Sequence, residues 1–284
     1  MKPTVRAMPR IAAAAVSCAA VLAPSAVSAS APGLPMRSAG TAAVTVYVAN
    51  NTSDTVTPIP AATNKPGKPI PVHGRPTAIA ITPNGATAYA TAYAANYGMD
   101  TADTVTPITT ATNTALPAVT VGASPFCVAI TPNGATAYVS GDRSSTVTPI
   151  HTATNKAGTP IKIGAAPAGI AITPDGATAY IASAVANTVT PIDTATNKPG
   201  TPIKVGRGPI YLAITPNGKT VYVANFHGTM GGGIGDTVTP ISTVTNKAAT
   251  PITVGRGPLY IAITPAHAEA VPQEAPAGCE GVNR

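Results

Sequence analysis

The sequence predicts an all-β fold, a β-propeller made of four-stranded blades. Three observations predict it: a repeat of about 42 residues, four short β-like segments in each repeat, and no helical period beyond the first 29 residues. Hydrophobic residues make up 44% of the 284 residues and charged residues only 10%, so a folded chain is expected in spite of 26 Gly and 31 Pro.

Two phrases, TVTPI and AITP, mark the repeat, and each occurs five times. Successive copies of both phrases are 49, 42, 42 and 49 residues apart, and 25 residues always separate a TVTPI proline from the next AITP proline. The two longer repeats therefore place seven extra residues in the same segment. The TVTPI prolines are Pro58, Pro107, Pro149, Pro191 and Pro240.

In the fourth repeat the four β-like segments are 212–215, 221–224, 237–241 and 251–254, separated by Asn-Gly, Asn-Lys and Gly-Pro turn signals. The uncharged, Ala-rich AITP segment is expected innermost, where the blades converge on the axis. The Pro-Ile-Lys-Val segment is expected outermost, because Lys and Pro protect an exposed edge. The proline inside TVTPI predicts a bulge or an early end of the third strand, because proline lacks an N–H.

Several phrases resemble those of one repeat family: Tyr-Val-Ala-Asn at 47–50 and 222–225, Asp-Thr-Ala-Thr-Asn-Lys at 193–198, and Val-Gly-Arg-Gly-Pro at 205–209. Over about residues 44–265 the chain resembles the YVTN-repeat β-propeller family of exported and cell-surface proteins. The resemblance implies a propeller, and members of that family commonly have seven blades.

Five blades are expected here, closed into a ring by the two ends of the repeat region. The region enters on a second strand, 44–49, and leaves on a first strand, 259–264, so these two segments could share one blade. The alternative is an open, shortened member of a lineage of longer propellers.

Outside the propeller, at 44–265, we expect a secretion signal peptide at 1–29, a flexible segment at 30–43 and a disordered tail at 266–284. The signal has a basic start, an apolar stretch at 11–22 and small residues at 27–29. Its apolar stretch is shorter than the roughly 20 residues that span a bilayer, so no transmembrane segment is expected in the mature chain. The prediction is a secreted, extracellular or envelope-associated protein, with lipidation at Cys18 left open.

The net charge of +7 is spread along the chain, which argues against nucleic-acid binding, because that function usually shows a concentrated basic stripe. Export would permit a disulfide between Cys127 and Cys279, but spacing alone does not establish it. The simpler expectation is a small buried Cys127 thiol and an unpaired Cys279.

Binding is expected on what we call the upper face, formed by the connections from second to third strands and from each fourth strand to the next blade. Candidate residues for a sugar, peptide or Ca²⁺ site are Asp103, Arg143, Arg207, Asp236 and Arg256. The simpler interpretation is that the aspartates cap turns and the arginines keep the surface soluble. The opposite, lower face is expected to carry Lys65, Lys156, Lys198 and Lys247, which either are ordinary solvated residues or attract an anionic cell-wall polymer.

Catalysis is not expected, because all three Glu residues (269, 274 and 280) follow the last strand and the four His residues show no metal-binding spacing. We expect no catalytic residue, no metal and no cofactor. The sequence favours an exported, monomeric, non-enzymatic scaffold that binds a protein or a cell-envelope polymer. The alternatives are a lactonase-like hydrolase of small molecules and a structural surface-layer component.

Overall fold

The computed structural model of the protein describes residues 44–72, 74–93, 103–226 and 235–264. The described residues form β-strands, turns and loops and contain no helix. The predicted signal peptide, N-terminal segment and C-terminal tail lie outside the described residues.

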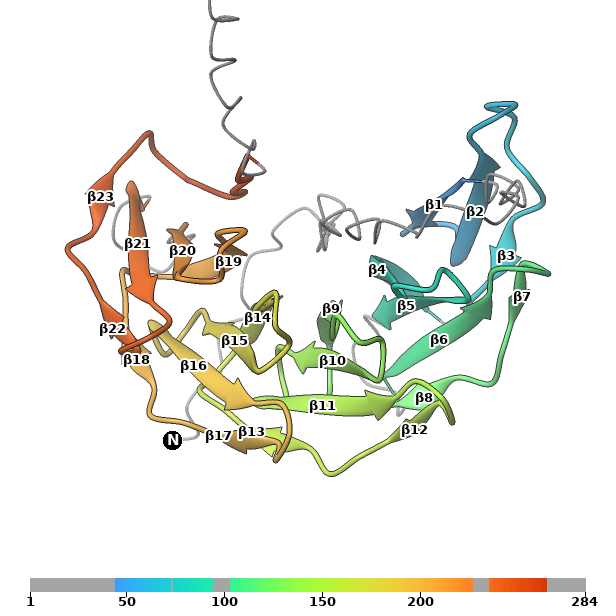
Figure 1. Cartoon of the computed structure of the whole chain (residues 1–284). Coiled ribbons are helices and arrows are strands. Elements are labelled where there is room, and N and C mark those ends of the chain that lie inside the picture. The colour runs from blue at the N-terminus through green and yellow to red at the C-terminus, as the bar shows by residue number, and fades with distance from the viewer. Residues whose placement is uncertain (1–43, 73, 94–102, 227–234, 265–284) are drawn as a thin grey trace, which may run out of the picture.

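Five antiparallel sheets follow one another around an open arc (Figure 1). We number them as blades in chain order: blade 1 is β1 to β3, blade 2 is β4 to β8, blade 3 is β9 to β13, blade 4 is β14 to β18 and blade 5 is β19 to β23. The chain is therefore an all-β propeller of five blades, as the sequence predicts.

Each repeat contributes its strands in the same order, from the inside of the arc outward. The first strands are β4 (Arg75–Ile81), β9 (Pro125–Ile130), β14 (Pro167–Ile172) and β19 (Pro209–Ile214). The second strands are β1 (Thr45–Asn50), β5 (Thr87–Tyr93), β10 (Thr136–Gly141), β15 (Thr178–Ser183) and β20 (Thr220–Asn225). The third strands are β2 (Thr55–Pro60), β6 (Thr104–Thr109), β11 (Thr146–His151), β16 (Thr188–Asp193) and β21 (Thr237–Ser242).

The outermost strand is divided into two short pieces in blades 2 to 5. These pieces are β7 (Thr114–Ala115) with β8 (Val119–Thr120), β12 (Lys156–Ala157) with β13 (Ile161–Lys162), β17 (Lys198–Pro199) with β18 (Ile203–Lys204), and β22 (Lys247–Ala248) with β23 (Ile252–Thr253); blade 1 has β3 (Ile70–Pro71). The innermost AITP segment and the outermost Lys- and Pro-bearing segment thus occupy their predicted places.

The proline of the third strand interrupts the neighbouring outer strand and leaves the third strand itself continuous. In blade 3, β11 runs through Pro149 without a register shift, so the bulge predicted at this proline is wrong. The Pro149 carbonyl accepts a hydrogen bond of 2.7 Å from the Gly158 N–H, on the side of the outer strand. The missing proline N–H therefore faces the same side, because both groups of a strand residue point to one neighbour. The outer strand is interrupted there, between β12 and β13.

The turn between first and second strands is fixed by a threonine and an asparagine. In blade 2 the Thr82 hydroxyl donates to Asn84 Oδ1 at 2.7 Å, and that oxygen also accepts from the Ala86 N–H at 3.0 Å. Gly85 has a φ of 71°, a conformation that glycine adopts without a steric penalty. The predicted Asn-Gly hairpin turns are therefore present.

The hydrophobic core lies between blades rather than inside any one of them. At the boundary of blades 4 and 5, Val189 and Ile203 of blade 4 pack against Val221, Val223 and Ile241 of blade 5. Equivalent residues form each of the other boundaries. Each blade is thus stabilised mainly by its neighbours, as expected for a repeat architecture.

Closure of the ring is not shown. In the described part of the chain β1 pairs with β2 alone, and residues 259–264 form no strand. These residues lie instead beside β19, where the ring of Tyr260 stacks on that of Tyr211 at a centroid distance of 4.7 Å. Residues 259–264 do not pair with β1 because blades 1 and 5 lie at opposite ends of the open arc (Figure 1).

Candidate functional site

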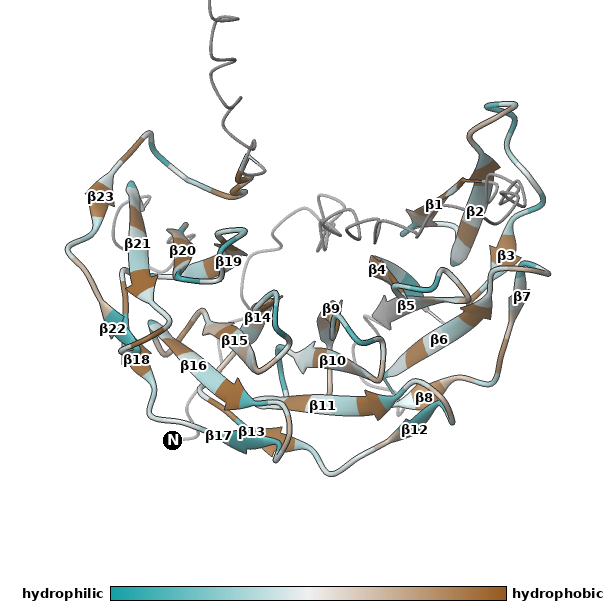
Figure 2. Cartoon of the chain, in the orientation of Figure 1, coloured by the Kyte–Doolittle hydropathy of each residue, from teal (hydrophilic) through white to brown (hydrophobic). Residues whose placement is uncertain are grey.

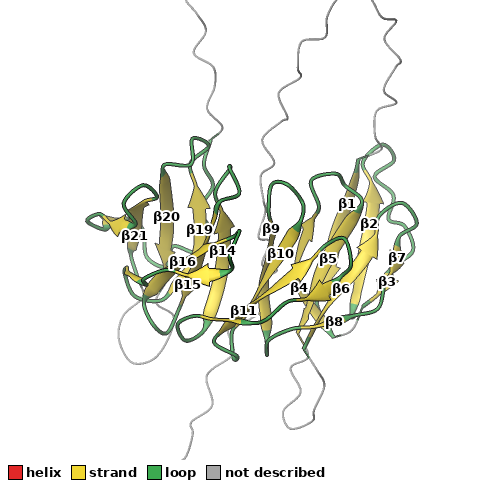
Figure 3. Ribbon diagram, turned by 60° about the horizontal axis from the view of Figure 1, so that its bottom comes forward, coloured by secondary structure: helices red, strands yellow, loops and turns green. Residues whose placement is uncertain are grey.

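The loops of the molecule gather at two opposite faces of the arc, as the side view in Figure 3 shows. On the upper face, the β10–β11 loop is joined by hydrogen bonds to the chain that enters and leaves its blade. The Asp142 N–H donates to the Ser124 carbonyl at 2.9 Å, and the Ile163 N–H donates to the Ser145 carbonyl at 3.0 Å. The prediction that these two kinds of connection share one face is therefore confirmed.

The two candidate aspartates, Asp103 and Asp236, occupy equivalent positions directly before a third strand. Their carbonyl oxygens accept hydrogen bonds from the N–H groups of Val121, at 3.0 Å, and Val254, at 2.6 Å. The same position makes the same bond in the other blades, through Asp54, Ser145 and Asn187. Since the bond uses the main chain and the side chain varies, the position has a structural role that requires no carboxylate.

The three candidate arginines, Arg143, Arg207 and Arg256, are all exposed. Arg207 and Arg256 stand at equivalent positions in Gly-Arg-Gly-Pro segments, and the glycines that follow them have φ values of 61° and 69°. Among the described residues no carboxylate lies within 4.0 Å of these guanidinium groups. The arginines are therefore available to an anionic partner, although the structure does not converge them with Asp103 and Asp236 into one pocket.

Asp142, next to Arg143, is the one aspartate among the described residues whose pKa is raised. Burial beside the loop raises the pKa of Asp142, and the positive charge of the adjacent Arg143 partly offsets the effect. A raised pKa alone does not make a catalytic acid, because acid–base catalysis also needs a partner group positioned around a substrate, and the pocket at the outer rim between blades 4 and 5 is lined by other residues.

The lower face is organised by a tyrosine-asparagine contact that recurs between blades. The hydroxyl of a second-strand tyrosine donates a 2.6 Å hydrogen bond to the Oδ1 of an asparagine in the next blade. The pairs are Tyr47 with Asn113, Tyr89 with Asn155, Tyr138 with Asn197 and Tyr180 with Asn246. These asparagines have φ values between 51° and 56°, in the left-handed region that Asn tolerates better than most residues. We call this contact the Tyr-Asn latch; it was not predicted, although both residues recur in the repeat.

Four lysines follow the asparagine of this turn in the sequence and are all exposed. They are Lys65, Lys156, Lys198 and Lys247. The last three begin the outer-strand pieces β12, β17 and β22, which Figure 2 draws in the hydrophilic colour. Because the latch fixes the preceding asparagine in blades 3, 4 and 5, these lysines are presented in equivalent positions from blade to blade.

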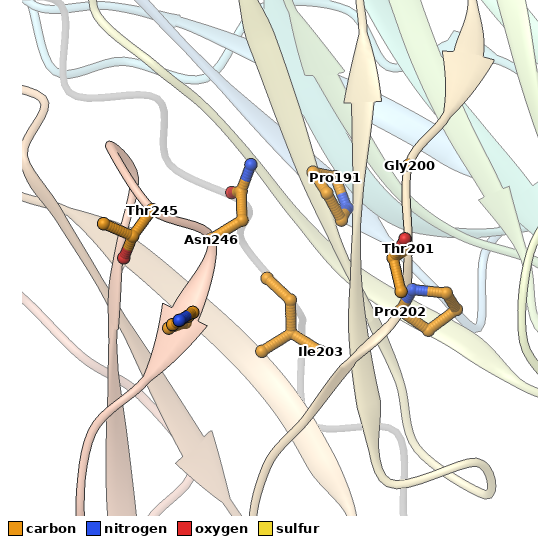
Figure 4. A pocket seen from close by; sticks show the side chains of 8 residues that line it. Pro191, Gly200, Thr201, Pro202, Ile203, Thr245 and Asn246 are labelled. Atoms are coloured by element: carbon orange, nitrogen blue, oxygen red, sulfur yellow. The ribbon is translucent and has the colours of Figure 1, made fainter.

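A pocket lies at the outer rim between blades 4 and 5, away from the upper-face candidates (Figure 4). It is lined by Pro191, Gly200, Thr201, Pro202, Ile203, Thr245, Asn246 and Lys247. The Oδ1 of Asn246 already accepts the hydrogen bond from Tyr180. Lys247 is the only titratable residue of this lining, so the pocket offers no acid-base pair.

Metal binding and thiol chemistry find little support in the described ranges. No group of three or more His, Cys, Asp or Glu there is placed to hold a metal ion. Cys127 on β9 is fully buried and is disulfide-bonded, so the expectation of a free thiol at this position is wrong. Both other cysteines, Cys18 and Cys279, lie outside the described residues.

Comparison with known proteins supports the fold but indicates no activity. No family model matches the chain, and no curated protein does. Among solved structures it is similar to hydrazine synthase of Kuenenia stuttgartiensis, with a TM-score of 0.56 and 27% identity over 63% of this chain. This chain spans 49% of that one. It is also similar to a functionally unknown protein from Desulfotomaculum acetoxidans, with a TM-score of 0.59 and 19% identity, covering 76% of this chain and 68% of the other.

Proposed function

We propose that the protein is an exported, non-enzymatic scaffold of the YVTN-repeat type, which binds a protein or a polymer of the cell envelope. The observation that carries the proposal is the row of exposed lysines on the lower face. Each lysine follows a turn with the same backbone conformation, and three of these turns are held by a Tyr-Asn latch. A regular cationic row of this kind suits an extended anionic chain better than a compact ligand.

The charge pattern favours an anionic envelope polymer over other partners. A lysine ammonium on a flexible stem is a strongly hydrated point charge and needs no fixed ligand geometry. Attraction between such groups and a polyanion is summed over several blades and is screened over about 8 Å at physiological ionic strength. Binding should therefore be multivalent, salt-sensitive and tolerant of polymer sequence.

The upper-face arginines provide the second candidate surface, which suits a protein partner. Arg143, Arg207 and Arg256 are exposed and have no carboxylate within ion-pair distance in the described ranges. Guanidinium groups bind carboxylates in pairs of parallel hydrogen bonds, so an acidic loop of a partner protein would fit them. The two surfaces lie on opposite faces and can be tested separately.

The test is co-sedimentation of the mature protein with purified cell walls that keep or lack their anionic phosphate polymer. Two triple variants remove the same charge from opposite faces. One is Lys156→Gln, Lys198→Gln and Lys247→Gln, and the other is Arg143→Gln, Arg207→Gln and Arg256→Gln. We expect the lysine variant to lose at least tenfold in apparent affinity and the arginine variant to bind like the wild type.

Other outcomes are informative in the same experiment. Loss of binding in the arginine variant alone, with capture of one envelope protein by crosslinking, moves the function to the upper face. Wild-type protein that stays in solution with intact walls at low salt contradicts the polymer proposal. Turnover of a lactone by the purified protein would contradict the non-enzymatic scaffold.

A further inference from the structure

The boundaries between neighbouring blades are built by one rule. Two aliphatic residues of a second strand and an isoleucine of a third strand pack on an aliphatic pair from the third and outer strands of the preceding blade. At the boundary of blades 1 and 2 the residues are Ala88, Ala90 and Ile108 on one side and Val56 and Ile70 on the other. All five are buried, with exposed fractions of 5% or less.

Blade 1 presents one half of such a boundary to solvent. Val46 and Val48 of β1 are equivalent to Ala88 and Ala90 of β5, but they are 50% and 39% exposed. Ile59, the equivalent of Ile108, is only partly buried. The side of blade 1 that faces away from blade 2 is therefore an apolar surface with the composition of an internal boundary.

Blade 5 presents the other half. Ile252 of β23 is 48% exposed, whereas its equivalents in the four other blades are at most 8% exposed. Val238 of β21 is partly buried, whereas its equivalents are fully buried. The two ends of the arc are thus complementary halves of a boundary that the chain builds four times internally.

The Tyr-Asn latch is divided between the same two ends. Tyr222 of blade 5 occupies the same repeat position as the four latched tyrosines. It has no asparagine partner in the part of the chain that the structure describes. Asn64 of blade 1 is exposed and has a φ of 51°, the conformation of the latched asparagines, without a tyrosine donor among the described residues. One end holds the missing donor and the other holds the missing acceptor.

The strands at the two ends are complementary as well. Within blade 5 the first-strand residues Leu212 and Ile214 lie opposite Val223 and Val221 of β20. Transferred through the repeat, this register places Ile261 opposite Val48 and Ile263 opposite Val46. A first strand at 259–264 would therefore fit the edge of β1 that does not contact β2.

We propose that this surface is an interface between copies of the chain, in which blade 5 of one molecule packs on blade 1 of the next. A second copy is the occupant because each half of the interface is present in every molecule, while the two halves of one molecule lie at opposite ends of the arc (Figure 1). The interface is head-to-tail and brings Tyr222 of one copy to Asn64 of the next. Such a contact builds closed rings or filaments of blades, depending on the rotation between copies.

The test is the oligomeric state of the full mature chain, measured by light scattering and analytical ultracentrifugation. We expect concentration-dependent dimers and larger species for the wild type. Val46→Asp blocks one end and Ile252→Asp blocks the other, so each variant alone should be monomeric. An equimolar mixture should form a 1:1 dimer and nothing larger, because one intact pair of ends remains.

Controls separate this interface from general loss of solubility or fold. Val185→Asp alters an exposed valine of blade 4, which is at neither end of the arc, and should leave the association unchanged. Far-ultraviolet circular dichroism checks that each variant folds. A wild type that is monomeric at every concentration overturns the proposal, and so does a mixture of the two blocked variants that fails to dimerise. A compact monomer by small-angle scattering would assign the two ends to closure within one chain.

Discussion

The hydroxyl of Tyr180 in blade 4 donates a 2.6 Å hydrogen bond to the Oδ1 of Asn246 in blade 5, 66 residues further along the chain. The bond joins the body of one blade to a turn of the next, beside the apolar boundary formed by Val189 and Val221. Polar and apolar contacts therefore act on the same blade boundary. The angle between blades is fixed at two points, once in the core and once at the lower face.

Tyr138→Phe should lower the free energy of unfolding by about 1 kcal/mol, because it removes the hydroxyl that donates to Asn197 Oδ1 at 2.6 Å and, more weakly, to the Thr194 carbonyl at 3.4 Å. The measurement is urea unfolding followed by circular dichroism. Tyr222→Phe is the matched control, since Tyr222 has no latch partner among the described residues, and at a concentration where the chain is monomeric it should change the stability by less than about 0.3 kcal/mol. Equal losses in the two variants would contradict the role of the latch.

Val221→Ala should destabilise the protein by about 2 kcal/mol, because Val221 is fully buried in the boundary between blades 4 and 5. Val46→Ala makes the same change at the equivalent position of blade 1, where the side chain is exposed, and should cost less than about 0.5 kcal/mol in the monomer. Both values come from urea unfolding at low protein concentration. A similar cost at both positions would show that blade 1 is covered in solution.

The blades could be predicted from the sequence because their determinants are local. The spacing of TVTPI and AITP, the Thr-Pro-Asn-Gly turn and the lysine of the edge strand each act within one repeat. The interruption opposite Pro149 lies in the outer strand and not in the third strand as predicted, because the sequence does not tell which neighbouring strand the missing proline N–H would face.

Closure and the Tyr-Asn latch depend on relationships between repeats, which the sequence pattern leaves undetermined. The angle between blades is set by the volumes packed at each boundary, such as Ala88 at one and Val221 at another. Counting strands predicts five blades, which the structure has, and also a closed ring, which the structure does not show. For the candidate site, parity placed the loops of Asp103 and Arg143 on one face, but side-chain positions on that face depend on the loops themselves.

Asp175→Asn should make the protein less sensitive to acid. The Thr173 hydroxyl and the Ala177 N–H donate hydrogen bonds to the Asp175 carboxylate, and they lower its pKa in the folded state below the usual value of about 3.9. The ionised carboxylate therefore stabilises the fold above about pH 4, and this contribution is lost as the pH falls through the lowered pKa. Unfolding midpoints in urea at pH 7 and pH 3 measure the effect.

The reciprocal change provides the control for this acid dependence. Asn217 makes the same turn in blade 5, where its Oδ1 accepts from the Lys219 N–H at 3.0 Å. Asn217→Asp should add an acid-sensitive turn and increase the difference between the two midpoints. If both variants keep the wild-type difference, the turn aspartate makes no measurable contribution to acid sensitivity.

Gly169→Ala should be among the most destabilising small changes in the propeller. A Cβ at Gly169 would lie 2.4 Å from the main-chain oxygen of Ile210 on the neighbouring first strand. Because a backbone atom cannot move aside as the end of a side chain can, β14 and β19 would have to separate, at a cost of about 2 kcal/mol or more. Thermal unfolding should show a clearly lower midpoint.

Gly255→Ala is the matched substitution at a site without such a constraint. A Cβ there meets no atom within 4 Å, and the φ of Gly255 is not in the left-handed region. Alanine restricts the unfolded chain more than glycine does, so this variant should be neutral or stabilised by up to about 1 kcal/mol. If Gly169→Ala were as stable as Gly255→Ala, the result would contradict the close contact between the first strands of blades 4 and 5, β14 and β19.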